Sequence, residues 1–241
     1  MIHEKIMLNI ERNSSLEAFV WDMSDREGSF RERPAVIVCP GGGYHICASR
    51  EAEPAAAAFY KAGFNAFILW YSVADESIWP AQLEDYEAAA AAIKANAGKW
   101  HINPEKIAVC GFSAGGHLAS CAAAMAQNRP AAAVLGYPVT GCDERRRADY
   151  PANAVAAVSE STCPCFIFAT RDDPVVPVFN SLNFMKALEE KAVPFEAHIY
   201  SHGQHAYSTA GKEIGELDIC PRVPHWVADS IEWLDETLNA L

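Results

Sequence analysis

The chain has few cysteines and no long apolar run. The first feature excludes a disulfide-rich scaffold, and the second excludes a membrane-spanning protein. Eight cysteines in 241 residues are too few for a disulfide-stapled scaffold. Cys39, Cys110 and Cys121 fall in apolar or alanine-rich segments, where reduced thiols pack. No stretch reaches the roughly 18 apolar residues of a membrane span, and the charged start MIHEKIMLNIERNSS lacks the apolar core of a secretory signal. We therefore expect a cytoplasmic protein with no membrane partner.

Positive charge is also scarce, since 19 Lys and Arg stand against 31 Asp and Glu, a net charge of −12. A body this acidic repels phosphate backbones, which excludes a nucleic-acid partner. The Cys163-Pro-Cys165 pair has neither zinc nor redox spacing and no second pair accompanies it. We expect no metal and no other cofactor. Hydrophobic residues, at 51%, are plentiful enough for a sizeable core and exclude global disorder.

Short, largely apolar runs alternate with helical segments along the chain. The runs expected to form strands are 34–39, 64–71, 106–110, 131–137, 164–170 and 195–200. The segments expected to form helices are 50–62, 80–99, 117–127, 180–191 and 225–241. This alternation predicts an α/β fold, with a doubly wound, mostly parallel sheet and helices on both faces. The first thirty residues add one or two antiparallel strands.

The domain organisation expected from this pattern is a single domain over 1–241, because no linker, repeat or low-complexity tract interrupts it. Residues 142–162 are polar, charged or small, and are expected to form a short cap-like connection. Arg145-Arg146-Arg147 lies within it. This basic run would attract an acidic substrate or would simply be a solvated loop.

The pentapeptide Gly111-Phe-Ser-Ala-Gly115 fits the pattern G-x-S-x-G and stands between an expected strand and an expected helix. Such a tight strand-to-helix turn holds a serine clear of the sheet at its carboxyl edge, at the positive end of the new helix. Ser113 is therefore the candidate nucleophile. The alternative is an ordinary glycine-rich turn that exposes a serine.

A serine hydroxyl needs an adjacent base to attack a substrate. His205 lies just beyond the last expected strand, in a loop that reaches over the carboxyl edge of the sheet. It is the favoured base, while His202 or a purely structural role for the loop histidine stays open. The histidines less suited by their positions are His3, His101, His117 and His198.

The base in turn needs a carboxylate that fixes its tautomer. Asp172 and Asp173 both follow the fifth expected strand, and we expect one to orient the base and the other to cap the turn. The chain order serine, aspartate, histidine is that of the α/β-hydrolases.

A tetrahedral intermediate also needs hydrogen-bond donors for its oxyanion. The N–H of Ala114 would supply one, and the glycines after the first core strand, at Gly42 and Gly43, would supply others. Glycine suits a close approach of backbone to substrate. A flexible loop or a phosphate cradle is the alternative, but the segment has neither a P-loop lysine nor the spacing G-x-G-x-x-G.

Several motifs together resemble the small α/β-hydrolase esterases of the acetylesterase and acetyl-xylan-esterase-like group. The segments that carry the resemblance are PGGGY at 40–44, REAEP at 50–54, YS at 71–72, GFSAGGHL at 111–118, DPVVP at 173–177 and HGQH at 202–205. The resemblance implies Ser113 as nucleophile, His205 as base and Asp173 as acid, because the family places the acid three residues before the valine of a Val-Pro pair. Asp172 stays open, since Val175 follows it at the same spacing.

The activity that the resemblance implies is that of a serine esterase acting on a small-molecule acyl ester. It would remove short acyl groups, acetyl above all, from small alcohols or acetylated sugars. Family members commonly have Gly-Pro-His-Gly around the base, whereas Gln204 and Ala206 flank His205 here. Tyr44 and Trp79 are candidates for lining a small pocket, with a core position as the alternative.

Two other functions share these motifs. A serine peptidase of prolyl-oligopeptidase type has the same triad, but that group usually adds a propeller domain for which 241 residues leave no room. A non-catalytic binding protein on the same fold would be expected to lose an element of the triad or of the oxyanion hole, and none is missing. The sequence leaves open whether the chain forms a homo-oligomer.

Overall fold

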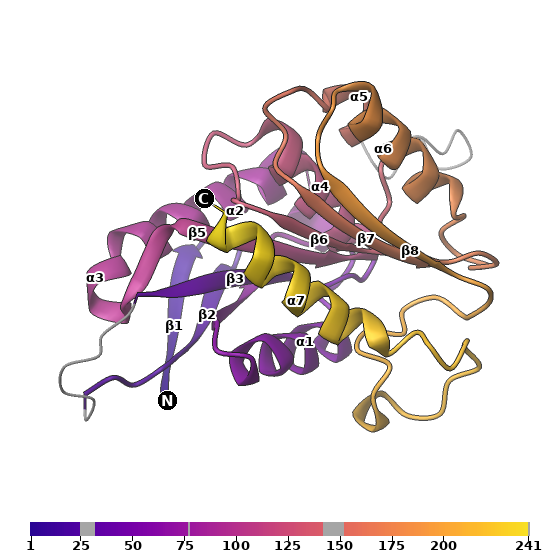
Figure 1. The fold of residues 1–241 in the computed structure, drawn as a ribbon. Helices are drawn as coiled ribbons and strands as arrows, with labels where there is room; N and C mark the ends of the chain where they lie inside the picture. The colour runs from indigo at the N-terminus through magenta and orange to yellow at the C-terminus, as the bar shows by residue number, and fades with distance from the viewer. Residues whose placement is uncertain (25–31, 77, 142–151, 241) are drawn as a thin grey trace.

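The computed structural model describes residues 1–24, 32–76, 78–141 and 152–240. Eight strands form one mixed sheet in the order β1-β2-β4-β3-β5-β6-β7-β8 (Figure 1). The strands are β1 (Ile2–Asn9), β2 (Ser14–Val20), β3 (Arg33–Cys39), β4 (Asn65–Trp70), β5 (Ile102–Phe112), β6 (Ala133–Gly136), β7 (Cys165–Thr170) and β8 (Phe195–Tyr200). The β1–β2 and β2–β4 pairs are antiparallel, whereas β4, β3, β5, β6, β7 and β8 run parallel to one another.

Helices cover both faces of the sheet. The helices are α1 (Ser49–Lys61), α2 (Ala81–Ala95), α3 (Ala97–Trp100), α4 (Ser113–Met125), α5 (Ala154–Ala157), α6 (Phe179–Glu190) and α7 (His225–Asn239), with 3-10 turns η1 (Ala74–Glu76) and η3 (Lys212–Ile214). Helices α1 and α7 lie across the face nearest the viewer in Figure 1. Their buried side chains share one core cluster, while those of α2, α4 and α6 share the cluster on the opposite face.

The central strands are apolar at successive positions because both of their faces are buried. In β3, Val36 and Val38 contribute to the cluster beneath α1 and α7, and Ala35 and Ile37 contribute to the cluster on the other face. All four side chains are fully buried. This two-sided burial confirms the doubly wound, mostly parallel sheet that the sequence predicts.

Two of the expected helices differ markedly from the observed ones, and part of one expected connection is not described. A break at Asn96 divides the helix expected over 80–99 into α2, which ends at Ala95, and α3, which begins at Ala97. Helix α4 begins at Ser113 rather than at residue 117, since the helix starts directly at the strand-to-helix turn. Of the expected cap-like connection, residues 142–151, with Arg145-Arg146-Arg147, lie outside the described residues, and the remainder contains α5.

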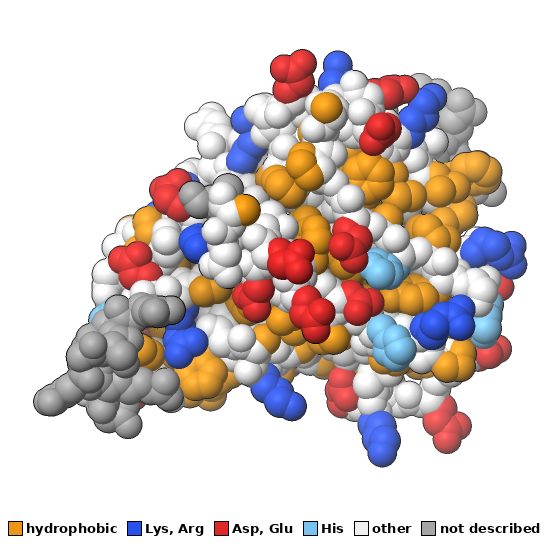
Figure 2. All heavy atoms as spheres, in the orientation of Figure 1, with side chains coloured by type: hydrophobic (Ala, Val, Ile, Leu, Met, Phe, Trp, Pro, Cys, Tyr) orange, Lys and Arg blue, Asp and Glu red, His pale blue; other side chains and the backbone are white. Residues whose placement is uncertain are grey.

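Acidic side chains gather in the middle of one face of the molecule, over and around α7 (Figure 2). This helix contributes Asp229, Glu232, Asp235 and Glu236. The local charge has the same sign as the net charge and repels polyanions in the same way. Among the described residues, no helix is both long enough and apolar enough to cross a membrane.

Candidate active site

Ser113 sits on the turn between β5 and α4. The chain is extended at Phe112 (φ −120°) and changes abruptly to φ +54° at Ser113, a conformation that residues with a side chain rarely adopt. Glycines make this turn sterically possible. A Cβ atom at Gly111 would lie 2.2 Å from the Gly115 carbonyl oxygen, and one at Gly115 would lie 2.0 Å from the Cys39 carbonyl oxygen. The G-x-S-x-G pattern therefore lets the start of α4 pack directly on the end of β3.

Gly115→Ala should lower the free energy of unfolding by about 1–3 kcal/mol, the usual cost of overpacking a rigid core. The added methyl group would meet backbone rather than a movable side chain. Gly98→Ala, in α3, is the matched control, because a Cβ atom there has no atom within 4 Å. The comparison is made by urea unfolding. Equal stability of both variants would contradict the packing argument.

His205 joins Ser113 to Asp173 through two hydrogen bonds. Its Nε2 lies 2.8 Å from Ser113 Oγ, and its Nδ1 lies 2.6 Å from Asp173 Oδ2. A carboxylate oxygen can only accept, so Nδ1 carries the proton and Nε2 is left to accept from the serine hydroxyl. The Asp173 side chain is fully buried and that of His205 is 11% exposed. The structure thus brings together the three residues that the sequence singles out, in the order a nucleophile, a base and an orienting acid require.

The roles of Asp172 and Asp173 differ from the expected ones, in which one residue orients the base and the other caps the turn. Asp173 does both, because its second oxygen, Oδ1, accepts the N–H groups of Val175 and Val176 at 2.8 and 2.9 Å. Asp172 is the more exposed of the two, and its Oδ1 accepts the Gly203 N–H at 2.9 Å. It therefore tethers the loop that carries His205, without contacting the imidazole.

The other candidate histidines have partners elsewhere. His202 Nδ1 lies 2.9 Å from Ser201 Oγ on the surface. His198, on β8, stacks on Phe166 at 5.1 Å and lies 2.8 Å from the Glu196 carboxylate. The imidazole that bonds Ser113 is that of His205, so His202, which the sequence left open as an alternative base, is not the one placed there. His198 packs within a strand, as its position in the sequence suggested.

The glycine loop after β3 runs beside the nucleophile. A Cβ atom at Gly41 would lie 3.0 Å from Ser113 Cβ, and Gly42 and Gly43 have φ values of +127° and +64°. Only glycine adopts both angles without strain. Ala114, in the first turn of α4, has an N–H that the helix itself does not use. The proposed donors, at Gly42, Gly43 and Ala114, thus belong to segments that meet at Ser113.

Tyr44 and Trp79, the two pocket candidates, meet a buried histidine. The Tyr44 hydroxyl lies 2.7 Å from His117 Nδ1, and His117 Nε2 lies 2.9 Å from the Ala152 carbonyl oxygen. Burial lowers the pKa of His117 to about 4, so the ring is neutral near pH 7 and Nε2 is its donor nitrogen. The Trp79 ring lies 5.6 Å from the same imidazole. Tyr44 is a core residue of this network, and a substrate contact for either side chain stays a prediction.

One buried acidic residue beside the site, Glu51, is not among the candidates that the sequence singles out. Glu51, from the segment REAEP, is 1% exposed and accepts hydrogen bonds from Gly41 and Tyr137. The segment that contains it, with Arg50, Glu53 and Pro54 around it, has the composition of a solvated helix start.

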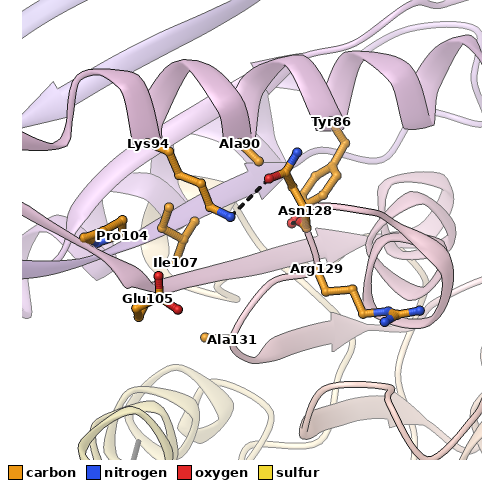
Figure 3. A pocket seen from close by; sticks show the side chains of 9 residues that line it. All are labelled: Tyr86, Ala90, Lys94, Pro104, Glu105, Ile107, Asn128, Arg129 and Ala131. Carbon is orange, nitrogen blue, oxygen red and sulfur yellow. Dashed lines mark hydrogen bonds between the residues drawn. The ribbon is translucent and has the colours of Figure 1, made fainter.

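A polar hollow of about 390 Å³ lies at the opposite end of the sheet (Figure 3). Lys94 Nζ donates to Asn128 Oδ1 at 3.1 Å across it. Ile107 of β5 lines the hollow, whereas Ser113 follows the other end of the same strand, about 20 Å away at the rise of a β-strand. This hollow is therefore distinct from the site around Ser113.

No group of three or more histidine, cysteine or acidic side chains in the described ranges is arranged to hold a metal ion. All seven cysteines in these ranges are free thiols, and burial raises the pKa of Cys39 and Cys121. Cys39 and Cys121 are therefore protonated near neutral pH and are poor nucleophiles.

Two family models match the chain in succession. The BD-FAE model matches residues 22–135, and the prolyl oligopeptidase family model matches residues 140–240. Among solved structures, the chain is 39% identical to MGS-M1, an alpha/beta hydrolase enzyme from a Medee basin deep-sea metagenome library, with a TM-score of 0.92 over 99% of this chain and 98% of that one. It is 32% identical to an acetyl ester-xyloside bifunctional hydrolase from Caldicellulosiruptor lactoaceticus, with a TM-score of 0.81 over 93% and 88% of the two chains.

Among curated relatives, an acetylxylan esterase from Xylanibacter ruminicola is 29% identical over 72% of this chain and 41% of its own length. The chain spans between 34% and 50% of the length of the curated relatives it matches. The fold and these matches define an α/β-hydrolase. Within that fold the chain belongs to the esterases of the BD-FAE and carbohydrate-esterase group, which confirms the resemblance drawn from its motifs.

Proposed function

We propose that this protein hydrolyses carboxylic esters through an acyl-enzyme intermediate. The observation that carries the proposal is the chain of hydrogen bonds from Ser113 through His205 to Asp173, at 2.8 and 2.6 Å. Ser113 Oγ attacks the ester carbonyl carbon while His205 Nε2 takes the hydroxyl proton. The oxyanion that forms accepts hydrogen bonds from the N–H groups of Ala114 and of the glycine loop.

The intermediate then collapses in the usual two stages of acyl transfer. The bond between the carbonyl carbon and the alcohol oxygen breaks, and His205 returns its proton to the leaving alcohol. A water molecule next attacks the acyl-serine while His205 takes one of its protons. The bond between the acyl carbon and Ser113 Oγ then breaks, His205 gives that proton to Ser113 Oγ, and the carboxylic acid leaves. Asp173 stays ionised throughout and stabilises the imidazolium. A steady-state assay with p-nitrophenyl acetate, with Ser113→Ala as the blank, tests this function.

The acyl group that we propose is short, with acetyl as the main candidate, and the alcohol is a small alcohol or a sugar. Support comes from the relatives, since one is named an acetylxylan esterase and another an acetyl ester-xyloside bifunctional hydrolase. The connection between Gly141 and Thr162 is also short for a cap that would enclose a long apolar chain.

Acetyl and propionyl esters should be hydrolysed with a higher kcat/KM than octanoyl esters. A long groove would gain roughly 0.8 kcal/mol for each buried methylene group, and a site without one gains nothing from the added carbons. The measurement is kcat/KM for p-nitrophenyl esters of two to eight acyl carbons, alongside acetylated xylose and acetylated xylan. A steady rise up to the octanoyl ester would contradict the proposal.

A serine peptidase of prolyl-oligopeptidase type is the second candidate, favoured by the family match over residues 140–240, which contains Asp173 and His205. The ester panel separates the two functions when it is run beside aminoacyl and prolyl p-nitroanilides. Ester hydrolysis without amide hydrolysis supports the esterase, and the reverse result supports the peptidase.

A further inference from the structure

The Glu51 carboxylate is buried behind Ser113 and takes no direct part in the proposed chemistry. It lies in the first turn of α1 and is 1% exposed. Burial raises its pKa, because a charge removed from water loses solvation. A buried carboxylate has to be offset by hydrogen-bond donors, and those of Glu51 come from two different parts of the site.

One partner is the glycine loop. Glu51 Oε2 accepts the Gly41 N–H at 2.8 Å. Gly41 also fits tightly between this carboxylate and the nucleophile, since a Cβ atom on it would lie 2.5 Å from Glu51 Oε2 and 3.0 Å from Ser113 Cβ. The carboxylate therefore fixes the position from which the next residues, Gly42 and Gly43, reach the reacting carbonyl.

The other partner leads to the histidine loop. Glu51 Oε1 accepts the hydroxyl of Tyr137 at 2.7 Å, and the oxygen of that hydroxyl accepts the Ser208 N–H at 3.0 Å. The Tyr137 ring packs edge-on against His205, with ring centres 4.9 Å apart. The hydroxyl thus connects the carboxylate to the backbone three residues after His205, and the ring supports the imidazole itself.

We propose that Glu51 is a positioning residue that holds the oxyanion loop and, through Tyr137, the His205 loop in register with Ser113. This inference rests on the proposed function of the same site. Hydrogen bonds to a charged, water-excluded acceptor are among the stronger ones in proteins. A misplacement of about 1 Å in the reacting groups costs on the order of 10²-fold in rate. The carboxylate's negative charge also favours the imidazolium that forms on His205 during acylation.

Glu51→Gln tests the proposal with little change in shape. The amide has one acceptor oxygen for two donors, so either the Gly41 N–H or the Tyr137 hydroxyl loses its acceptor, and the negative charge is gone. We expect kcat for p-nitrophenyl acetate to fall by about 10²-fold, with KM within about twofold of wild type. Rates are normalised to the concentration of folded protein, measured by circular dichroism, so that a loss of folded protein does not count as a loss of activity.

Tyr137→Phe and the double variant test whether the two residues act as one chain. Tyr137→Phe keeps the carboxylate and its bond to Gly41 but removes the link to Ser208, so kcat should fall while KM changes little. If both residues act through one chain, the double variant should lose no more than the larger single loss. Should Glu51→Gln fail to fold, Tyr137→Phe alone decides, and an unchanged kcat would overturn the proposal.

Asp85→Asn is the matched control, because Asp85 is the other carboxylate of comparable burial outside the triad in the described ranges. It accepts hydrogen bonds from Ser14, Ser72 and Arg12. Its loss should lower stability and leave kcat within about twofold. An equal fall in kcat in Asp85→Asn and Glu51→Gln, or a Glu51→Gln variant as fast as wild type, overturns the positioning role alone. If the wild-type protein does not hydrolyse the ester, both the proposed function and the positioning role of Glu51 are overturned.

Discussion

Ser113→Ala should abolish ester hydrolysis, with a fall in kcat on the order of 10⁶-fold, as in a triad that loses its nucleophile. The acyl group then has no oxygen to which it can be transferred, and His205 has no proton to take. The change removes only the hydroxyl oxygen and keeps Cβ, so the variant should fold. The measurement is kcat for p-nitrophenyl acetate, with circular dichroism to verify folding.

Ser120→Ala provides the control for this experiment. Ser120 lies in the same helix, is also buried, and donates its hydroxyl proton to the Gly116 carbonyl oxygen at 2.7 Å. It is two turns from the nucleophile, and its replacement should leave kcat near the wild-type value. Appreciable turnover by Ser113→Ala, in a preparation free of other esterases, would rule out Ser113 as nucleophile.

Asp173→Asn should cost roughly 10⁴-fold in kcat, the loss measured for the same change in a well-studied serine protease triad. The geometry around Asp173 explains why the amide cannot compensate. The N–H groups of Val175 and Val176 require an acceptor at the Oδ1 position, which places the amide nitrogen against His205. Two donors would then face each other unless the imidazole carries its proton on Nε2, and in that tautomer it cannot accept the proton of Ser113.

Asp172→Asn is the paired measurement, since it changes the neighbouring carboxylate in the same way. The Asn oxygen can still accept the Gly203 N–H, so kcat at neutral pH should change little. If Asp172→Asn were the inactive variant and Asp173→Asn the active one, the assignment of the acid would be off by one residue.

The parallel core and the serine turn are readable from the sequence because their causes are local. Strands such as 195–200 are bounded by turn residues, and the structure gives β8 these same bounds. The pattern around Ser113 needs only its own glycines and the strand before it. The start of α4 is different, since the sequence predicts a helix from residue 117, after the glycine-rich segment, whereas the helix begins four residues earlier, at Ser113 itself.

The network behind the site could not be read in the same way because its partners are distant in the chain. Glu51 bonds Gly41 from 10 residues away and Tyr137 from 86 residues away. Nothing in its own segment indicates that it is buried. Likewise, the hydrogen bonds from the Val175 and Val176 N–H groups to Asp173 depend on the backbone of the turn that follows Asp173. The conformation of that turn could not be predicted from the sequence.

The order of the strands has a consequence for how activity appears during folding. Ser113 and His205 are 92 residues apart in the chain, and β6, β7 and β8 must be added to β5 before the loop after β8 can reach the serine. Long-range parallel pairing is slow, because chain entropy is lost before the contacts that offset it have formed. The rate at which ester hydrolysis recovers after dilution from denaturant therefore reports when the sheet is complete. The circular dichroism signal also includes helices that form earlier.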